Sequence, residues 1–227
     1  MADLSNSELF ESILKKAILK QQVYRKTLAG FNLLKSIIQK LAAEYQSYPK
    51  PDDPLILFEN RDKGTFEMEL KFGGDVLVFV MHTNVFEFPR DHEVMKTNYI
   101  SGDKERSYCG IIHIYNFLAD SFKYNRINDA GYLIGRIFIN KDDHYYLEGK
   151  KEIGLIYNNF ATSVVDEDSL TEVVKQAIMY TLNFDLLTPL YDNIKEVSVM
   201  DMQMTIDNIS LKTGKRLGFR FQADIDR

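Results

Sequence analysis

The stretch Gly74-Asp75-Val76-Leu77-Val78-Phe79-Val80-Met81-His82 defines the most strongly apolar strand of this 227-residue chain. Its apolar run, 76–81, is uninterrupted, whereas a strand with one face in water would alternate polar and apolar residues. A short buried helix is the alternative, but β-branched and aromatic side chains beside a Gly-Gly-Asp turn favour a strand. We therefore predict a central strand that is covered on both faces. The stretches 108–115 and 132–139 resemble it.

Composition indicates a globular protein. Hydrophobic residues make up 45% of the chain and charged residues 27%, which excludes a disordered class. The net charge is −5, whereas domains that hold a nucleic-acid backbone usually carry a basic surface, so nucleic acid is a disfavoured partner. The one cysteine, Cys109, lies in an apolar stretch and is expected to be a buried, inert thiol. Without a signal-peptide pattern or an apolar run of roughly 18 residues, we expect a cytoplasmic protein without a membrane segment.

Residues 5–48 carry the strongest helical pattern. Ser5 and Glu8 have the spacing of a capping box, in which each side chain accepts a hydrogen bond from a free backbone N–H. Glycine weakens a helix, so the segment is either one helix or a pair broken near Gly30. The apolar residues that recur at threes and fours are Phe10, Leu14, Ala17, Tyr24, Leu28, Phe31, Ile38, Ala42 and Tyr45.

One unbroken helix over residues 5–48 would be about 60 Å long. A compact domain of this size has a radius of gyration of about 17 Å, so the helix would overhang it and leave apolar side chains in water. We therefore predict a homodimer that forms through residues 5–48. The alternative is a helix pair that folds back onto the sheet of its own chain.

The rest of the chain predicts further strands and a second long helix. The expected strands are 55–59, 65–72, 108–117, 132–139 and 144–148. A three-residue turn in the last hairpin would place Arg136 opposite Glu148, which satisfies both charges, so we predict that register. Residues 89–107 look like a long surface loop. Ser169 and Glu172 have capping-box spacing before a helix that runs to Leu182.

These patterns predict an α+β fold: a mostly antiparallel sheet of about six strands, covered by a long N-terminal helix or helix pair and by a C-terminal helix. We predict two parts of the chain: residues 1–50 as an N-terminal helical segment that packs on or extends from the domain, and residues 51–227 as a single α+β domain. The stretch from Val197 to Arg227 alternates apolar and polar residues and is expected to be extended.

Two short patterns are candidates for catalysis. Glu69-Leu70-Lys71 has the Glu-x-Lys form that resembles the core of metal-dependent nucleases, often written PD-(D/E)xK, with Asp52 or Asp62 upstream. Glu148-Gly149-Lys150 has the same form, with Asp129 or Asp143 upstream. The alternative interpretation is an ordinary solvated strand face, and the acidic balance of the chain argues against phosphate-backbone binding.

Candidates for ligand binding are His82, His113, Arg136 and Tyr145. The two histidines could meet if their strands pair, Arg136 interrupts an apolar strand, and Tyr145 could line a pocket or an interface. No histidine or cysteine spacing indicates a metal site, and no glycine motif indicates a nucleotide cofactor.

The sequence favours a non-enzymatic binding or interaction module that self-associates. The alternatives are a metal-dependent phosphodiester hydrolase that uses a Glu-x-Lys strand, and a binder of a small apolar or aromatic ligand between sheet and helix.

Overall fold

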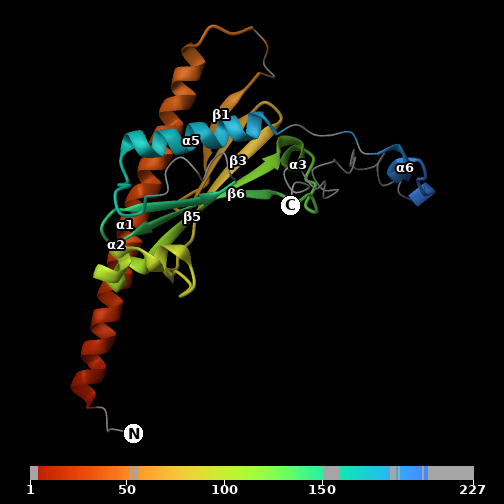
Figure 1. Ribbon diagram of the computed structural model, residues 1–227. Coiled ribbons are helices and arrows are strands. Elements are labelled where there is room, and N and C mark those ends of the chain that lie inside the picture. The colour runs from red at the N-terminus through yellow and green to blue at the C-terminus, as the bar shows by residue number, and fades with distance from the viewer. Residues whose placement is uncertain are drawn as a thin grey trace.

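The computed structural model describes residues 5–51, 53, 56–150, 159–184, 188, 190–200, 202 and 203. The predicted α+β fold is confirmed: a seven-stranded antiparallel sheet packs against a long N-terminal helix and a C-terminal helix (Figure 1). The strands are β1 Phe58–Asp62, β2 Glu67–Phe72, β3 Asp75–Met81, β4 Phe86–Glu87, β5 Tyr108–Leu118, β6 Tyr132–Asn140 and β7 Tyr145–Gly149. Their order is β1-β2-β3-β5-β6-β7, with β4 paired to β5.

The central position of β3 is confirmed. It pairs with β2 on one side and with β5 on the other, both antiparallel. Residues 76–79 are all buried, so the strand is covered on both faces. The glycine turn places Phe72 opposite Asp75, and Gly73 has a φ of 52°, which a residue without a Cβ adopts at little cost. The predicted strand at 55–59 is displaced, because β1 begins at Phe58.

The N-terminal segment is one continuous helix, α1 Asn6–Ser47, so of the two alternatives the unbroken helix is confirmed and the break near Gly30 is wrong. The capping box of Ser5 and Glu8 is confirmed. Gly30 instead permits close packing, because a Cβ at this position would lie 2.8 Å from Cδ1 of Ile139. Residues 5–18 are exposed, whereas many later residues of α1 pack on the sheet.

The main core lies between α1, α5 Glu167–Leu182 and one face of the sheet. Its helical members include Phe31, Leu34, Val173 and Val174, and its strands contribute Leu77, Phe79, Ile112 and Ile137. The predicted start of the second helix is wrong in detail: the capping box that begins α5 joins Asp166 to Ser169 rather than Ser169 to Glu172.

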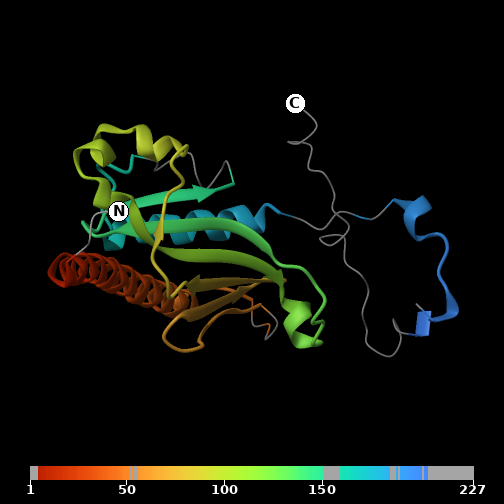
Figure 2. The ribbon, with the colours of Figure 1, turned by 90° about the horizontal axis from the view of Figure 1, so that it is seen from below.

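A smaller core covers part of the second sheet face. The predicted loop over 89–107 is wrong, because this segment folds into η1 Glu93–Lys96, α2 Asn98–Gly102 and η2 Lys104–Ser107. Their buried residues Val94 and Ile100 join a cluster with Phe88, Cys109, Ile111, Phe138, Tyr146 and Phe160. Figure 2 shows these small helices and α1 on opposite sides of the strands. Cys109 is 1% exposed, and burial raises its pKa, as expected of an inert thiol.

The last hairpin has the predicted register. Arg136 lies opposite Glu148, and its Nε donates a hydrogen bond of 2.6 Å to Oε2 of Glu148. Two short helices complete the described chain, α3 Ala119–Lys123 and α6 Tyr191–Ile194. Most of the stretch predicted to be extended, 197–227, lies outside the described residues; 199, 200, 202 and 203 are helical. None of the described helices is both long and apolar enough to cross a bilayer.

Candidate binding site on the open face of the sheet

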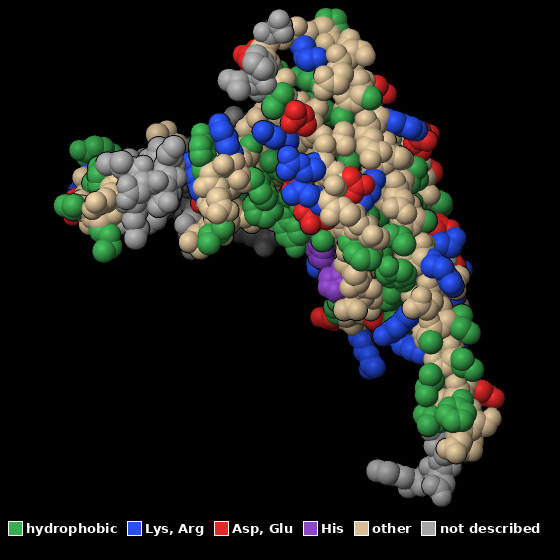
Figure 3. All heavy atoms as spheres, turned by 180° about the vertical axis from the view of Figure 1, so that it is seen from behind, with side chains coloured by type: hydrophobic (Ala, Val, Ile, Leu, Met, Phe, Trp, Pro, Cys, Tyr) green, Lys and Arg blue, Asp and Glu red, His purple; other side chains and the backbone are tan. Residues whose placement is uncertain are grey.

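Among the described residues, the small helices leave much of the second sheet face uncovered. We call this area the open face (Figure 3). The strand registers assign the following residues to it: Glu59 and Arg61 of β1, Glu67, Glu69 and Lys71 of β2, Val76, Val78 and Val80 of β3, His113, Tyr115 and Phe117 of β5, Arg136 of β6 and Glu148 of β7. The open face therefore has four parts. A charged wing on β1 and β2 is followed by a strip of valines on β3 and a strip of aromatic rings on β5, and a second charged wing is formed by Arg136 and Glu148 on β6 and β7.

The valine strip is not in water. Val76 and Val78 of β3 are only 5% and 7% exposed. Lys71 and Phe117 flank Val76 in the sheet register, and Glu69 and Tyr115 flank Val78. Long charged side chains cover apolar surface with their stems and keep the charge in solvent, so this surface offers charged groups above an apolar floor.

Rings follow β5 along the open face without interruption. The ring centroid of His113 lies 5.7 Å from that of Tyr115, Tyr115 lies 6.4 Å from Phe117, and Phe117 lies 5.4 Å from Phe122 of α3. His82 extends the row, with its centroid 6.5 Å from His113. The pairing of β3 with β5 thus brings the two candidate histidines together.

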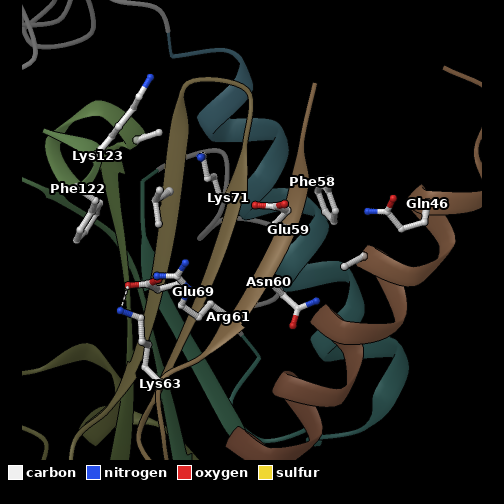
Figure 4. Close-up of a pocket in the computed structure, with 13 residues that line it drawn as sticks. Gln46, Phe58, Glu59, Asn60, Arg61, Lys63, Glu69, Lys71, Phe122 and Lys123 are labelled. Carbon is white, nitrogen blue, oxygen red and sulfur yellow. Dashed lines mark ion pairs between the residues drawn. The ribbon is translucent and has the colours of Figure 1, made fainter. Parts of the chain in front are cut away.

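A pocket of about 580 Å³ lies where the charged wing of β1 and β2 approaches α3 (Figure 4). It extends around β1, so part of its lining, including Gln46 and Asn60, lies on the side of that strand toward α1. The charged lining residues are Glu59, Arg61, Lys63, Glu69, Lys71 and Lys123. Four cations against two carboxylates make this a locally basic site in an acidic chain.

Some of these charges are already paired. Nζ of Lys63 lies 3.2 Å from Oε1 of Glu69, and Nζ of Lys123 lies 5.0 Å from the ring centroid of Tyr124. By contrast, the structure shows no hydrogen bond or ion pair of the Arg61 or Lys71 side chain with any described residue. Arg61 and Lys71 are therefore the cations that can hold an added anion.

Glu69 and Lys71, the first pair of catalytic candidates, both line this pocket. The expected third acid does not join them, because Asp62 is on the α1 side of β1, where its Oδ1 lies 2.7 Å from Nζ of Lys35. Asp52 lies outside the described residues. In the described part of the chain, no three His, Cys, Asp or Glu side chains are grouped so that they could hold a metal ion.

The second pair of candidates is separated from that pocket. Glu148 is engaged by Arg136 on the far side of the open face, and Lys150 follows the end of β7. The acids named with this pair have other partners: Asp143 pairs with Lys26, and Asp129 accepts a hydrogen bond from Ser121.

Of the ligand candidates, His82, His113 and Arg136 lie together at one end of the open face. Tyr145 does not, because its side chain is 1% exposed within the main core. Sequence reasoning missed Arg61, Phe122 and Lys123. Arg61 follows the same alternation as Glu59, but the two α3 residues reach the pocket only through the β3–β5 pairing.

We expect Arg136 to contribute, after burial, to the lowered pKa of His113. Burial, the Arg136 guanidinium and His82 lower the pKa of His113 from its ordinary value. Arg136→Gln should raise it, which imidazole resonances followed by NMR against pH will detect. Lys71→Gln, a matched loss of charge on the same face, should shift it less. Between the ordinary histidine pKa and the lowered pKa of His113, the unfolded chain binds more protons than the folded chain. The free energy of unfolding of the wild type should therefore decrease as the pH falls through this interval. An unchanged titration in Arg136→Gln would contradict this assignment.

The comparisons with known proteins identify no relative: no protein-family model, no curated protein and no solved structure matches this chain.

Proposed function

We propose that this protein is a non-enzymatic interaction module that forms a homodimer through the first turns of α1. The observation that carries the proposal is the exposure of residues 5–18, whose first turns extend beyond the rest of the domain (Figures 1 and 3). We call these residues the projecting segment. Its thirteen helical residues, 6–18, extend about 20 Å. The first residue of α1 to be buried is Leu19.

The projecting segment is apolar as well as exposed. Its large side chains are exposed as follows: Leu9 41%, Phe10 58%, Ile13 55%, Leu14 60% and Ile18 62%. Single exposed apolar residues are ordinary, but a contiguous row at helical spacing is typical of an interface. The pairs Leu9 and Ile13, Phe10 and Leu14, and Leu14 and Ile18 are each four positions apart, so the row follows one side of the helix.

A second copy of the chain is the occupant that the charges favour. The acidic residues Glu8 and Glu11 precede the basic residues Lys15, Lys16 and Lys20 in α1. In an antiparallel pair, the acidic start of each projecting segment lies beside the basic end of the other, and the two helix dipoles oppose one another. Such a contact is self-complementary and closes as a twofold dimer.

Light scattering after gel filtration tests the proposal. We expect a dimer for the intact chain at micromolar concentration and a folded monomer for Phe10→Asp with Leu14→Asp, because two carboxylates would then have to be buried in the helix pair. Gln21→Asp with Asn32→Asp adds the same charge at exposed positions of α1 outside the projecting segment and should remain dimeric.

A monomeric intact chain would overturn the self-association. Incubation with Mg²⁺ or Mn²⁺ and DNA or RNA tests the alternative hydrolase, whose candidates Glu69 and Lys71 line one pocket. Metal-dependent cleavage that is lost in Glu69→Ala would overturn the non-enzymatic assignment.

A further inference from the structure

We propose that the open-face pocket around Arg61 and Lys71 binds a small phosphorylated molecule that also carries a flat ring, the chemistry of a nucleoside monophosphate. This site is distinct from the projecting segment and does not depend on the homodimer. The whole pocket, part of which lies on the α1 side of β1, has a volume of about 580 Å³, within the range of roughly 300–1,000 Å³ that is typical of small-ligand sites.

The charges of the pocket favour an anion. Lys63 forms an ion pair with Glu69. The other charged residues of the lining are three cations, Arg61, Lys71 and Lys123, and one carboxylate, Glu59. The guanidinium of Arg61 can donate two parallel hydrogen bonds to phosphate oxygens, and the ammonium of Lys71 can add a third. Arg61 and Lys71 lie on adjacent strands and both line the pocket, with Arg61 opposite Glu69 and Lys71 opposite Glu59 (Figure 4).

The aromatic wall of the pocket accounts for the flat ring. Phe122 lines the pocket and is 51% exposed, while Phe117 packs against it at an angle of 68°. Phe117 therefore holds the Phe122 ring in place and leaves a face free. Heterocyclic rings stack on such faces. Glu59, which lies opposite Lys71, can accept hydrogen bonds from ligand hydroxyl groups.

The same face disfavours a long nucleic-acid strand. Glu67 lies on β2 beyond the pocket, and Glu148 lies across the sheet in the same row as Glu67. A phosphate backbone that continued along this face would meet those carboxylates. A ligand with one phosphate group meets only the basic end, so the charge pattern selects a small molecule.

Calorimetric titration of the full chain with AMP, adenosine and inorganic phosphate tests the proposal. We expect saturable AMP binding that is tighter than that of either fragment. Arg61→Gln with Lys71→Gln should weaken AMP binding by at least about tenfold, because charge-assisted hydrogen bonds are lost. Phe122→Ser should weaken AMP binding and leave phosphate binding unchanged. The matched control, Arg25→Gln with Lys96→Gln, removes two exposed charges outside the pocket and should bind AMP like the wild type.

Three results would overturn the proposal. The first is no AMP binding at millimolar concentration, or binding that the control variant weakens as much as the pocket variant. The second is AMP binding no tighter than phosphate binding, since Phe122 would then contribute nothing. The third is tighter binding of a ten-residue oligothymidylate than of AMP with the same loss in the pocket variant, which would assign the face to single-stranded nucleic acid. Circular dichroism of each variant confirms that a loss of binding is not a loss of folding.

Discussion

Replacement of Phe31 by alanine is expected to lower the free energy of unfolding by about 3–5 kcal/mol. Phe31 is 0% exposed and lies in the main core, where α1 meets the sheet. Loss of its ring removes buried apolar surface and leaves a cavity, because the rigid sheet on one side and α5 on the other restrict collapse. Urea denaturation followed by circular dichroism measures the change.

Phe10→Ala provides the comparison within the same helix. Phe10 is 58% exposed on the projecting segment, so the same chemical change should leave the stability of the folded monomer within about 0.5 kcal/mol. Both proteins should be measured at concentrations below dimerisation, since a dimer contact would add to the apparent stability of the wild type. Equal losses in the two variants would show that the projecting segment packs against its own domain.

The contrast between Phe10 and Phe31 also shows what helical periodicity can predict. Both residues fall on one apolar row of the sequence, and the row correctly predicts a helix. It does not say where the supporting sheet ends, because that depends on the lengths and order of distant strands. The overhang was predictable only from the length of α1 relative to a compact domain.

Local sequence patterns predicted the strands of the sheet better than they predicted the short helices that cover it. An uninterrupted apolar run predicted the central strand, and the charges of Arg136 and Glu148 predicted the register of the last hairpin. The short helices over 93–107 were missed, because Val94 and Ile100 are too widely spaced to form a periodic pattern. Both become buried only through contact with strand residues such as Phe138 and Tyr146, which lie far away in the sequence.

About half of the candidate site was predictable from the sequence. Alternation along β2 places Glu69 and Lys71 on one face, and this can be read from sequence. The side taken by Asp62 depends on where β1 begins and on its register with β2, which puts Asp62 opposite Met68, a core residue. Because β1 begins three residues later than predicted, the sequence did not show that Asp62 lies outside the pocket or that Arg61 lines it.

Gly110→Ala is the second substitution with a large expected effect, because α1 packs against β5 without space for a side chain at this position. A Cβ at Gly110 would lie 2.1 Å from Oγ1 of Thr27 and 2.7 Å from its Cβ. Thr27 cannot turn away freely, since it is 0% exposed and its hydroxyl donates a hydrogen bond of 2.9 Å to the carbonyl of Val23. The helix would have to move off the sheet, so we expect a loss of about 1–3 kcal/mol or more in unfolding free energy.

A double-mutant cycle locates the cause of that loss. Thr27→Ala removes the hydroxyl and methyl groups that the new Cβ would meet, so it should restore part of the stability of Gly110→Ala even though it destabilises the wild type. Gly74→Ala is the matched control: an added Cβ there meets nothing within 4 Å, and the expected change is within about 0.5 kcal/mol. If Gly110→Ala and Gly74→Ala unfold at the same urea concentration, α1 does not approach β5 as closely as the structure shows. If Thr27→Ala gives no restoration, the strain arises elsewhere than at this contact between helix and strand.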